Sequence, residues 1–135
     1  MVNLSPIEFS KEIINVASKS ELVESFEVNI LDDMIVKIRV YLTDGTFIDI
    51  FYNADTQKIA YALIKNKKRI FGIDNTDGWH LHPFKSPEIH QTCNSITFQE
   101  FLYSVEQHQK INQYKNETEI NEQFGVDTKK DENRD

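Results

Sequence analysis

The sequence contains little cysteine and glycine and no long apolar run, and each scarcity excludes a class of structure or chemistry. Cys93 is the only cysteine among 135 residues, so the chain can form neither an intrachain disulfide nor a zinc site built from its own cysteines. The four glycines form no phosphate-binding loop, and no Gly-x-Ser-x-Gly elbow is present. No apolar run reaches the length of about 18 residues that a membrane-spanning helix needs.

The N-terminal segment bears on the location of the protein, and the charge of the chain bears on its partners. The segment Met1 to Pro6 lacks the basic flank and apolar stretch of a secretory signal, so we expect a cytoplasmic protein without a membrane partner. The net charge of −7 argues against a nonspecific nucleic-acid binder, which usually carries a basic face. The segment Lys65 to Arg69 nevertheless holds four basic residues, so a local anion-binding patch remains open.

Two amphipathic helices are predicted, one near each end of the ordered part. The first covers residues 5–18 and the second begins at Thr97 and ends near Gln113. Both begin with a capping box, Ser5 with Glu8 and Thr97 with Glu100. Each has an apolar face, formed by Phe9, Ile13, Val16 and Ala17 in the first helix and by Phe98, Phe101, Leu102 and Val105 in the second.

Between the helices, short segments alternate apolar and polar residues, as half-buried strands do. Asp44-Gly45 is a hairpin signal, since both central positions of a type I′ turn need positive φ. Short connections favour an antiparallel meander of about five strands, with both helices packed on it, in an α+β fold. Residues 1–113 would form this single domain, and the polar, acidic residues 114–135 a disordered tail. The predicted strands are 26–30, 37–42, 46–52, 58–64 and 69–71.

The segment Gly78 to Phe84 is the one concentrated candidate for chemistry. Alternation in an extended segment puts His80 and His82 on one face, with Trp79 and Leu81 on the other. Two imidazoles can accept and donate protons near neutral pH. They would suit general base and general acid roles in metal-independent cleavage of a phosphodiester, with the ribose 2′-hydroxyl as nucleophile.

Other residue types in the chain could assist such a reaction. Arginine and lysine can stabilise the charge of the transition state, tyrosine can orient a ribose or stack on a base, and a carboxylate can orient an imidazole. The candidate catalytic residues are therefore His80, His82, Arg39 and Tyr52, and the candidate substrate-binding residues are Arg69, Lys68, Tyr41, Tyr61, Asp74 and Trp79.

Two other interpretations of the histidine pair stay open. A His-x-His pair in a strand is often a polar stripe that faces solvent. Alternatively, His90, alone or with a carboxylate such as Glu88, could complete a three-ligand metal site of a metal-dependent hydrolase. Pro83 and Pro87 leave the geometry between these ligands undetermined, and our main hypothesis requires neither metal nor cofactor.

A series of segments in the middle of the chain carries a resemblance to a known family: Arg39 to Asp49, Phe51 to Asn53, Tyr61 to Ile64, Arg69 to Gly72, Asp74-Asn75 and Gly78 to Phe84, with Pro87 and His90. Over roughly Phe26 to Val105 they resemble the TumE family of toxins from toxin–antitoxin systems. The resemblance implies a prokaryotic toxin that acts on RNA or translation and is neutralised by a helix-turn-helix antitoxin. A non-catalytic protein that blocks a translation component is the alternative of another class, and an exposed edge strand could form a homodimer.

Overall fold

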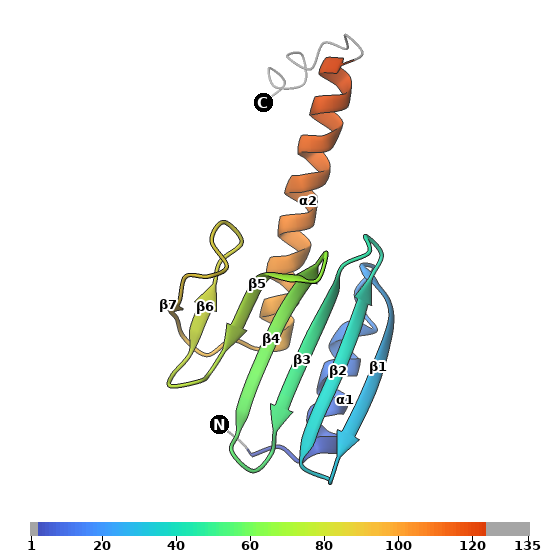
Figure 1. The fold of residues 1–135 in the computed structure, drawn as a ribbon. Helices are drawn as coiled ribbons and strands as arrows, with labels where there is room; N and C mark the ends of the chain where they lie inside the picture. Colours follow the sequence, from blue (N-terminus) through green and yellow to red (C-terminus); the bar gives the residue numbers. More distant parts are fainter. Residues whose placement is uncertain (1–2, 124–135) are drawn as a thin grey trace. The chain divides into compact units, whose positions relative to one another are not determined.

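The protein is an α+β fold built on one antiparallel sheet, as the sequence predicts (Figure 1). The computed structural model describes the backbone of residues 3–123 and the side chains of residues 3–112. By its backbone contacts the chain divides into two units, Met1–Phe101 and Leu102–Asp135. The first unit holds the first helix, the whole sheet and the first turn of the second helix.

The sheet is a seven-stranded meander in which each strand pairs with the next along the chain. The predicted meander is confirmed as its first five strands, and two further short strands extend it. One of these, β6, carries His80 and His82 and ends at His82, since the next residue, Pro83, has no backbone N–H to continue the pairing. The strands are β1 Val23–Leu31, β2 Ile35–Leu42, β3 Phe47–Asn53, β4 Lys58–Lys65, β5 Lys68–Asp74, β6 His80–His82 and β7 Gln91–Thr92.

The turn between β2 and β3 differs in type from the prediction. The hairpin at Asp44-Gly45 is present, but Gly45 alone has positive φ, at +89°. Asp44 instead accepts hydrogen bonds from Thr46 through its carboxylate, which fixes the turn without the left-handed backbone of a type I′ turn. The hairpin prediction is therefore right and the turn type wrong.

The first helix, α1 (Pro6–Ala17), packs on the face of the sheet that carries Tyr52. Its predicted capping box is confirmed, since the side chains of Ser5 and Glu8 each bond the other's backbone N–H. The ring of Phe9 stacks on the ring of Tyr52 with centroids 4.3 Å apart. The Tyr52 hydroxyl donates to the backbone carbonyl of Leu4 at 2.6 Å, which ties the segment before the helix to β3.

The second helix, α2 (Phe98–Gln123), begins where the sequence predicts and extends beyond the expected end near Gln113. The capping box at its start is confirmed, because Thr97 and Glu100 bond each other's backbone N–H. All four residues of its predicted apolar face are buried. In its first turn, Phe98 and Phe101 contact Tyr61 of β4, with ring centroids 5.6 and 5.4 Å apart. Residues 124–135 of the predicted tail lie outside the described residues.

The two faces of the sheet have different surroundings. Alternate residues of β2, β3 and β4 are buried on the side that faces α1, and they form the core together with the apolar face of this helix. The edge strand β1 has only one neighbour, so Phe26 and Ile30 are more exposed than the sequence suggested, at 39% and 38%. Within residues 3–101 no helix lies on the opposite side, which we call the open face.

None of the helices in the described part of the chain combines the length and apolar composition needed to cross a bilayer.

Candidate active site

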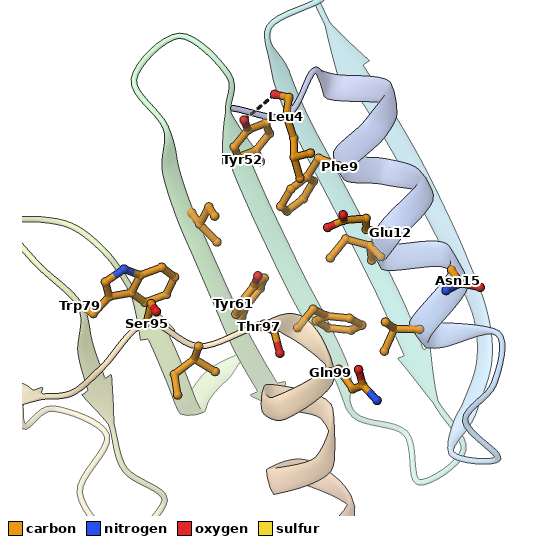
Figure 2. A pocket seen from close by; sticks show the side chains of 15 residues that line it. Leu4, Phe9, Glu12, Asn15, Tyr52, Tyr61, Trp79, Ser95, Thr97 and Gln99 are labelled. Atoms are coloured by element: carbon orange, nitrogen blue, oxygen red, sulfur yellow. Dashed lines mark hydrogen bonds between the residues drawn. The ribbon is translucent and has the colours of Figure 1, made fainter. Parts of the chain in front are cut away.

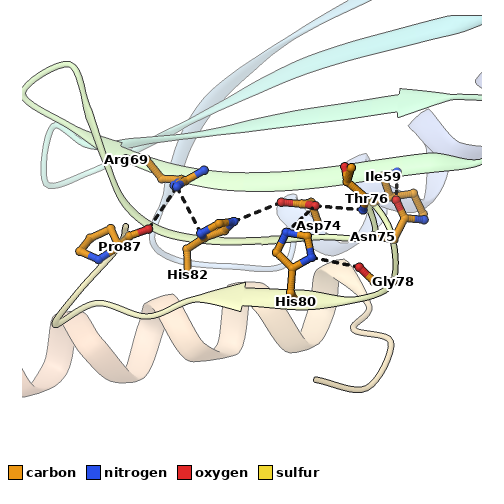
Figure 3. A network of polar contacts seen from close by, with 9 residues as sticks. All are labelled: Ile59, Arg69, Asp74, Asn75, Thr76, Gly78, His80, His82 and Pro87. Atoms are coloured by element: carbon orange, nitrogen blue, oxygen red, sulfur yellow. Dashed lines mark hydrogen bonds and ion pairs between the residues drawn. The ribbon is translucent and has the colours of Figure 1, made fainter. Parts of the chain in front are cut away.

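Two neighbouring strands bring the central residues of the candidate site together. Asp74 at the end of β5 pairs with His80, and Gly72 pairs with His82. Since alternate residues of a strand share a face, Asp74 and both histidines project from the open face. The two imidazole rings have centroids 5.2 Å apart. The same-face arrangement that alternation predicts for this segment is therefore present (Figure 3).

The turn that joins β5 to β6 is held by backbone and amide contacts. Gly78 has φ +102°, a conformation that favours glycine, and its carbonyl accepts a hydrogen bond from Nδ1 of His80 at 3.0 Å. The side chain of Asn75 accepts from the backbone N–H of Ile59 at 2.8 Å and donates to the carbonyl of Gln57 at 2.9 Å. Asn75 thus fixes the turn against the start of β4, and Asp74 is the residue that reaches the imidazoles.

Asp74 bridges the two histidines with one carboxylate. Its Oδ1 lies 3.1 Å from Nε2 of His80, and its Oδ2 lies 3.3 Å from Nε2 of His82. Partial burial alone would raise the pKa of Asp74, but the N–H of Thr76, the hydrogen bond from His82 and the charge of His80 outweigh it. The pKa of Asp74 is therefore below its usual value, and the carboxylate is charged near neutral pH.

Arg69 determines which nitrogen of His82 carries the hydrogen. Its Nη2 lies 3.2 Å from Nδ1 of His82, and a guanidinium can only donate. Nδ1 must therefore accept, which leaves the hydrogen on Nε2, where it points at Asp74. His82 is only 2% exposed, and burial lowers its pKa, assisted by the positive charge of Arg69. His82 is thus a neutral, buried link between Arg69 and Asp74.

Arg69 reaches this face because β5 contains a bulge. Leu63 pairs with Phe71, but the next residue of β4, Ile64, pairs with Arg69, so β5 has one extra residue. Such a bulge reverses the alternation and can re-aim a side chain near a functional site. Gly72, which was not among the predicted site residues, makes room for Arg69: a Cβ at this position would be 2.9 Å from Cδ of Arg69. A glycine inside a strand is the signal that indicates such a close approach.

His80 is the more accessible imidazole of the predicted pair. Its side chain is 17% exposed, and both ring nitrogens face oxygen acceptors: Nδ1 the carbonyl of Gly78 and Nε2 the carboxylate of Asp74. A hydrogen on both nitrogens, as in the imidazolium, satisfies both contacts. His80 and His82 therefore have different hydrogen-bond roles, although they share one strand and one face.

A third imidazole comes from the loop between β6 and β7. The ring centroid of His90, which is exposed, lies 5.0 Å from that of His80 and 4.4 Å from that of His82. One ring nitrogen of each histidine lies within 4.8 Å of the others, a spacing that a metal ion could bridge. The loop is tied down where Nη2 of Arg69 donates to the carbonyl of Pro87 at 3.1 Å. These histidines, Asp74 and Arg69 line an open pocket of about 610 Å³.

Three other candidates lie on the helix side of the sheet, opposite the histidines. Tyr52 and Tyr61 are buried there, and Trp79 lines the same pocket of about 560 Å³ between α1 and the start of α2 (Figure 2). Burial raises the pKa of Tyr61, with a smaller contribution from the charge of Glu12, so its hydroxyl stays neutral. The structure does not bring these three side chains together with His80 and His82.

The remaining candidates are spread over the open face and its edge. Arg39 on β2 pairs with Asp49 at 2.8 Å and lies over the ring of Phe47, 4.1 Å from its centroid. Tyr41 packs against the same ring. Lys68 is exposed at the start of β5. Four strand spacings, about 19 Å, separate Arg39 from the β6 histidines, so it does not reach their pocket.

Comparison with known families agrees with the resemblance seen in the sequence. Residues 13–109 match the family described as Toxin TumE. The chain belongs to this toxin family. No curated protein and no solved structure matches the chain.

The match to the TumE toxins includes every residue of the candidate site. It begins within α1, covers all seven strands and extends into α2. The bulge at Arg69, the Asp74 carboxylate and all three clustered histidines lie inside it. The family therefore supports a toxin role for the chain that carries this site.

Proposed function

We propose that the protein is the toxin of a toxin–antitoxin pair and that it cleaves RNA without a metal ion. The observation that carries this proposal is the continuous chain of contacts from Arg69 through His82 and Asp74 to His80. It combines a phosphate-binding cation, an imidazole held by a carboxylate, and an accessible histidine in one pocket.

In this proposal the three histidines have different roles. The 2′-hydroxyl of a ribose would lose its proton to the exposed His90 and attack the adjacent phosphorus. His80 would give a proton to the 5′-oxygen as the P–O5′ bond breaks, leaving a 2′,3′-cyclic phosphate and a 5′-hydroxyl. A substrate oxygen that replaces Oδ1 of Asp74 at Nε2 of His80 would meet this proton. His82, buried and engaged at both nitrogens, would position Arg69 and Asp74.

Arg69 would neutralise the charge that develops on the phosphate. Both of its contacts, to His82 and to the carbonyl of Pro87, use Nη2. A guanidinium has five N–H donors in a planar fork, so Nε and Nη1 can donate to phosphate oxygens. Removing such a donor from a transition-state site typically lowers the rate about 10²- to 10³-fold.

The test is growth arrest on induced expression, followed by incubation of the purified chain with RNA. We expect a 2′,3′-cyclic phosphate product, no effect of a chelator, and a loss of about 10²- to 10⁴-fold in His80→Ala. His108→Ala is the matched control, because His108 is the fourth histidine and lies outside the cluster. Growth arrest that persists in His80→Ala would instead favour a protein that blocks a translation component.

A metal-dependent hydrolase is the second candidate, favoured by the spacing of His80, His82 and His90. Three histidines with an open position are a common zinc site. Against it, Arg69 donates to Nδ1 of His82 and places the hydrogen on Nε2, so neither nitrogen of the neutral ring offers a lone pair to a metal. Activity that a chelator abolishes and Zn²⁺ restores would support the metal site and contradict the metal-independent proposal.

The partner of the toxin would be an antitoxin, and we propose one of the helix-turn-helix type. Membership of the toxin family supports an antitoxin partner in general. Co-expression with a helix-turn-helix protein encoded beside the toxin should restore growth and yield a complex that co-purifies. Continued growth arrest in its presence would exclude that protein as the antitoxin.

A further inference from the structure

The row of residues that crosses the open face from His80 has the composition of a binding surface. Strand pairing sets His80, Asp74, Ala60, Phe51 and Lys37 opposite one another on β6, β5, β4, β3 and β2. Because the sheet register aligns them, they form one line across the face, which we call the His80 row. It connects the candidate active site with an aromatic ring and a cation.

Between the candidate active site and Phe51, the surface of the sheet carries only small side chains, and we call this stretch the floor. Ala60 and Ala62 on β4 are partly exposed, and the next small residue, Gly72 on β5, is covered by Arg69. Small side chains allow a ligand to approach the backbone of the sheet closely. The ring of Phe51, also partly exposed, borders this floor on the side away from the histidines. At about 4.8 Å per strand, Phe51 lies about 14 Å from His80.

The charges on this part of the face suit a polyanion, although the whole chain is acidic. Lys37 and Lys58 are exposed, and neither makes an ion pair within residues 3–112. The carboxylate of Asp49 is paired with Arg39, and that of Asp74 with the histidines. The lysines are therefore available for phosphates, and the carboxylates of Asp49 and Asp74 are already paired with other groups.

We infer that the open face is the substrate platform and that its ligand is a single-stranded RNA segment lying along the His80 row. One base would stack on Phe51, and the backbone phosphates would lie near Lys37 and Lys58, with the scissile phosphate at His80. Stacking on an aromatic side chain requires an unpaired base, so a duplex cannot use this surface in the same way. This inference rests on the proposed action on RNA and adds the form of the substrate and its position.

The experiment measures binding separately from cleavage. The probe is a short fluorescent oligoribonucleotide with 2′-O-methyl groups throughout, which lacks the nucleophile and stays intact. With the purified full chain, Phe51→Ala should weaken binding between about 5-fold and 100-fold. Lys37→Gln should weaken it too and make it less dependent on salt. Phe26→Ala is the matched control, because Phe26 is an exposed phenylalanine on the edge strand and lies outside the row.

Each outcome distinguishes the platform from the proposed cleavage. Binding that is weakened by Phe51→Ala and Lys37→Gln, unaffected by Phe26→Ala and weaker for the same sequence as a duplex supports the platform. Cleavage of RNA with equal probe affinity in wild type and both variants overturns the platform and leaves the cleavage proposal intact. Failure of the wild type to bind the probe also overturns it. Phe51→Leu, which keeps the side-chain bulk without the ring, replaces Phe51→Ala if that variant does not fold.

Discussion

Nη2 of Arg69 lies 3.2 Å from Nδ1 of the buried His82, and this contact fixes the direction of the hydrogen bonds in the candidate site. The guanidinium donates, so His82 accepts at Nδ1 and donates at Nε2 to Asp74. Asp74 then holds His80 with its other oxygen. Arg69 on β5 thereby helps to orient the imidazole of His80, which lies three contacts away.

Replacing Arg69 should affect both activity and the titration of His82. In Arg69→Gln we expect RNA cleavage to fall about 10²- to 10³-fold, as on loss of a transition-state donor. The pKa of His82 should rise, because burial and then the charge of Arg69 lower it in the wild type. Histidine resonances followed by NMR across pH measure this shift. Lys68→Gln, which removes the neighbouring exposed charge, should leave it unchanged; an unaltered His82 titration in Arg69→Gln would contradict the contact.

The stability of the fold should decrease in mildly acidic solution because of His82. Its folded-state pKa is lowered, so below about pH 6.5 the unfolded chain binds a proton that the folded chain excludes. The free energy of unfolding of the wild type should therefore fall as the pH drops through this value. The free energy of unfolding of His82→Gln should fall less over the same pH range. Urea unfolding at about pH 7.5 and about pH 5.5 measures the difference. If the free energy of unfolding decreases equally in the wild type and in His82→Gln between these two pH values, His82 is not the group responsible.

Gly72 should be needed for the position of Arg69 rather than for the fold. In Gly72→Ala the added Cβ would lie 2.9 Å from Cδ of Arg69 and 3.3 Å from the carbonyl oxygen of Tyr61. The flexible arginine side chain must then shift, which should disturb its contact with His82. We expect at least about a tenfold loss of cleavage with a folded protein. The double variant Gly72→Ala/Arg69→Gln should lose little more than Arg69→Gln alone, because both changes act on one contact. Additive losses would mean that Gly72 acts elsewhere.

Tyr52 should contribute to stability and not to catalysis. Tyr52→Phe keeps the stack on Phe9 and removes two hydrogen bonds of the hydroxyl, one donated to the carbonyl of Leu4 and one accepted from Nε2 of Gln57. Their loss should cost about 1 to 3 kcal/mol of unfolding free energy. RNA cleavage should be unchanged, since the hydroxyl lies on the helix side of the sheet. Chemical denaturation and a cleavage assay on the same preparation test both statements. Loss of activity at unchanged stability would return Tyr52 to the list of catalytic candidates.

Local patterns in the sequence were sufficient for most of the fold. Both capping boxes, the apolar faces of both helices and the first five strands follow from interactions between residues close in the chain. All are confirmed, except that Val16 in the face of the first helix is only half-buried. The alternation that puts His80 and His82 on one face is equally local. The turn type at Asp44-Gly45 was wrong because a side-chain hydrogen bond to Thr46 replaced the left-handed backbone.

The connections within the candidate site depended on the tertiary structure. Pairing of β5 with β6 placed Asp74 beside His80, and the chain returned His90 to the pair through a loop that the sequence left undetermined. The bulge at Arg69 reversed the face that simple alternation assigns, and strand pairing put Tyr52 and Tyr61 on the side of the sheet opposite the histidines. The sequence by itself determined which residue types and local elements are present. Which side chains meet was decided by strand register, because a shift of one residue moves a side chain to the other face.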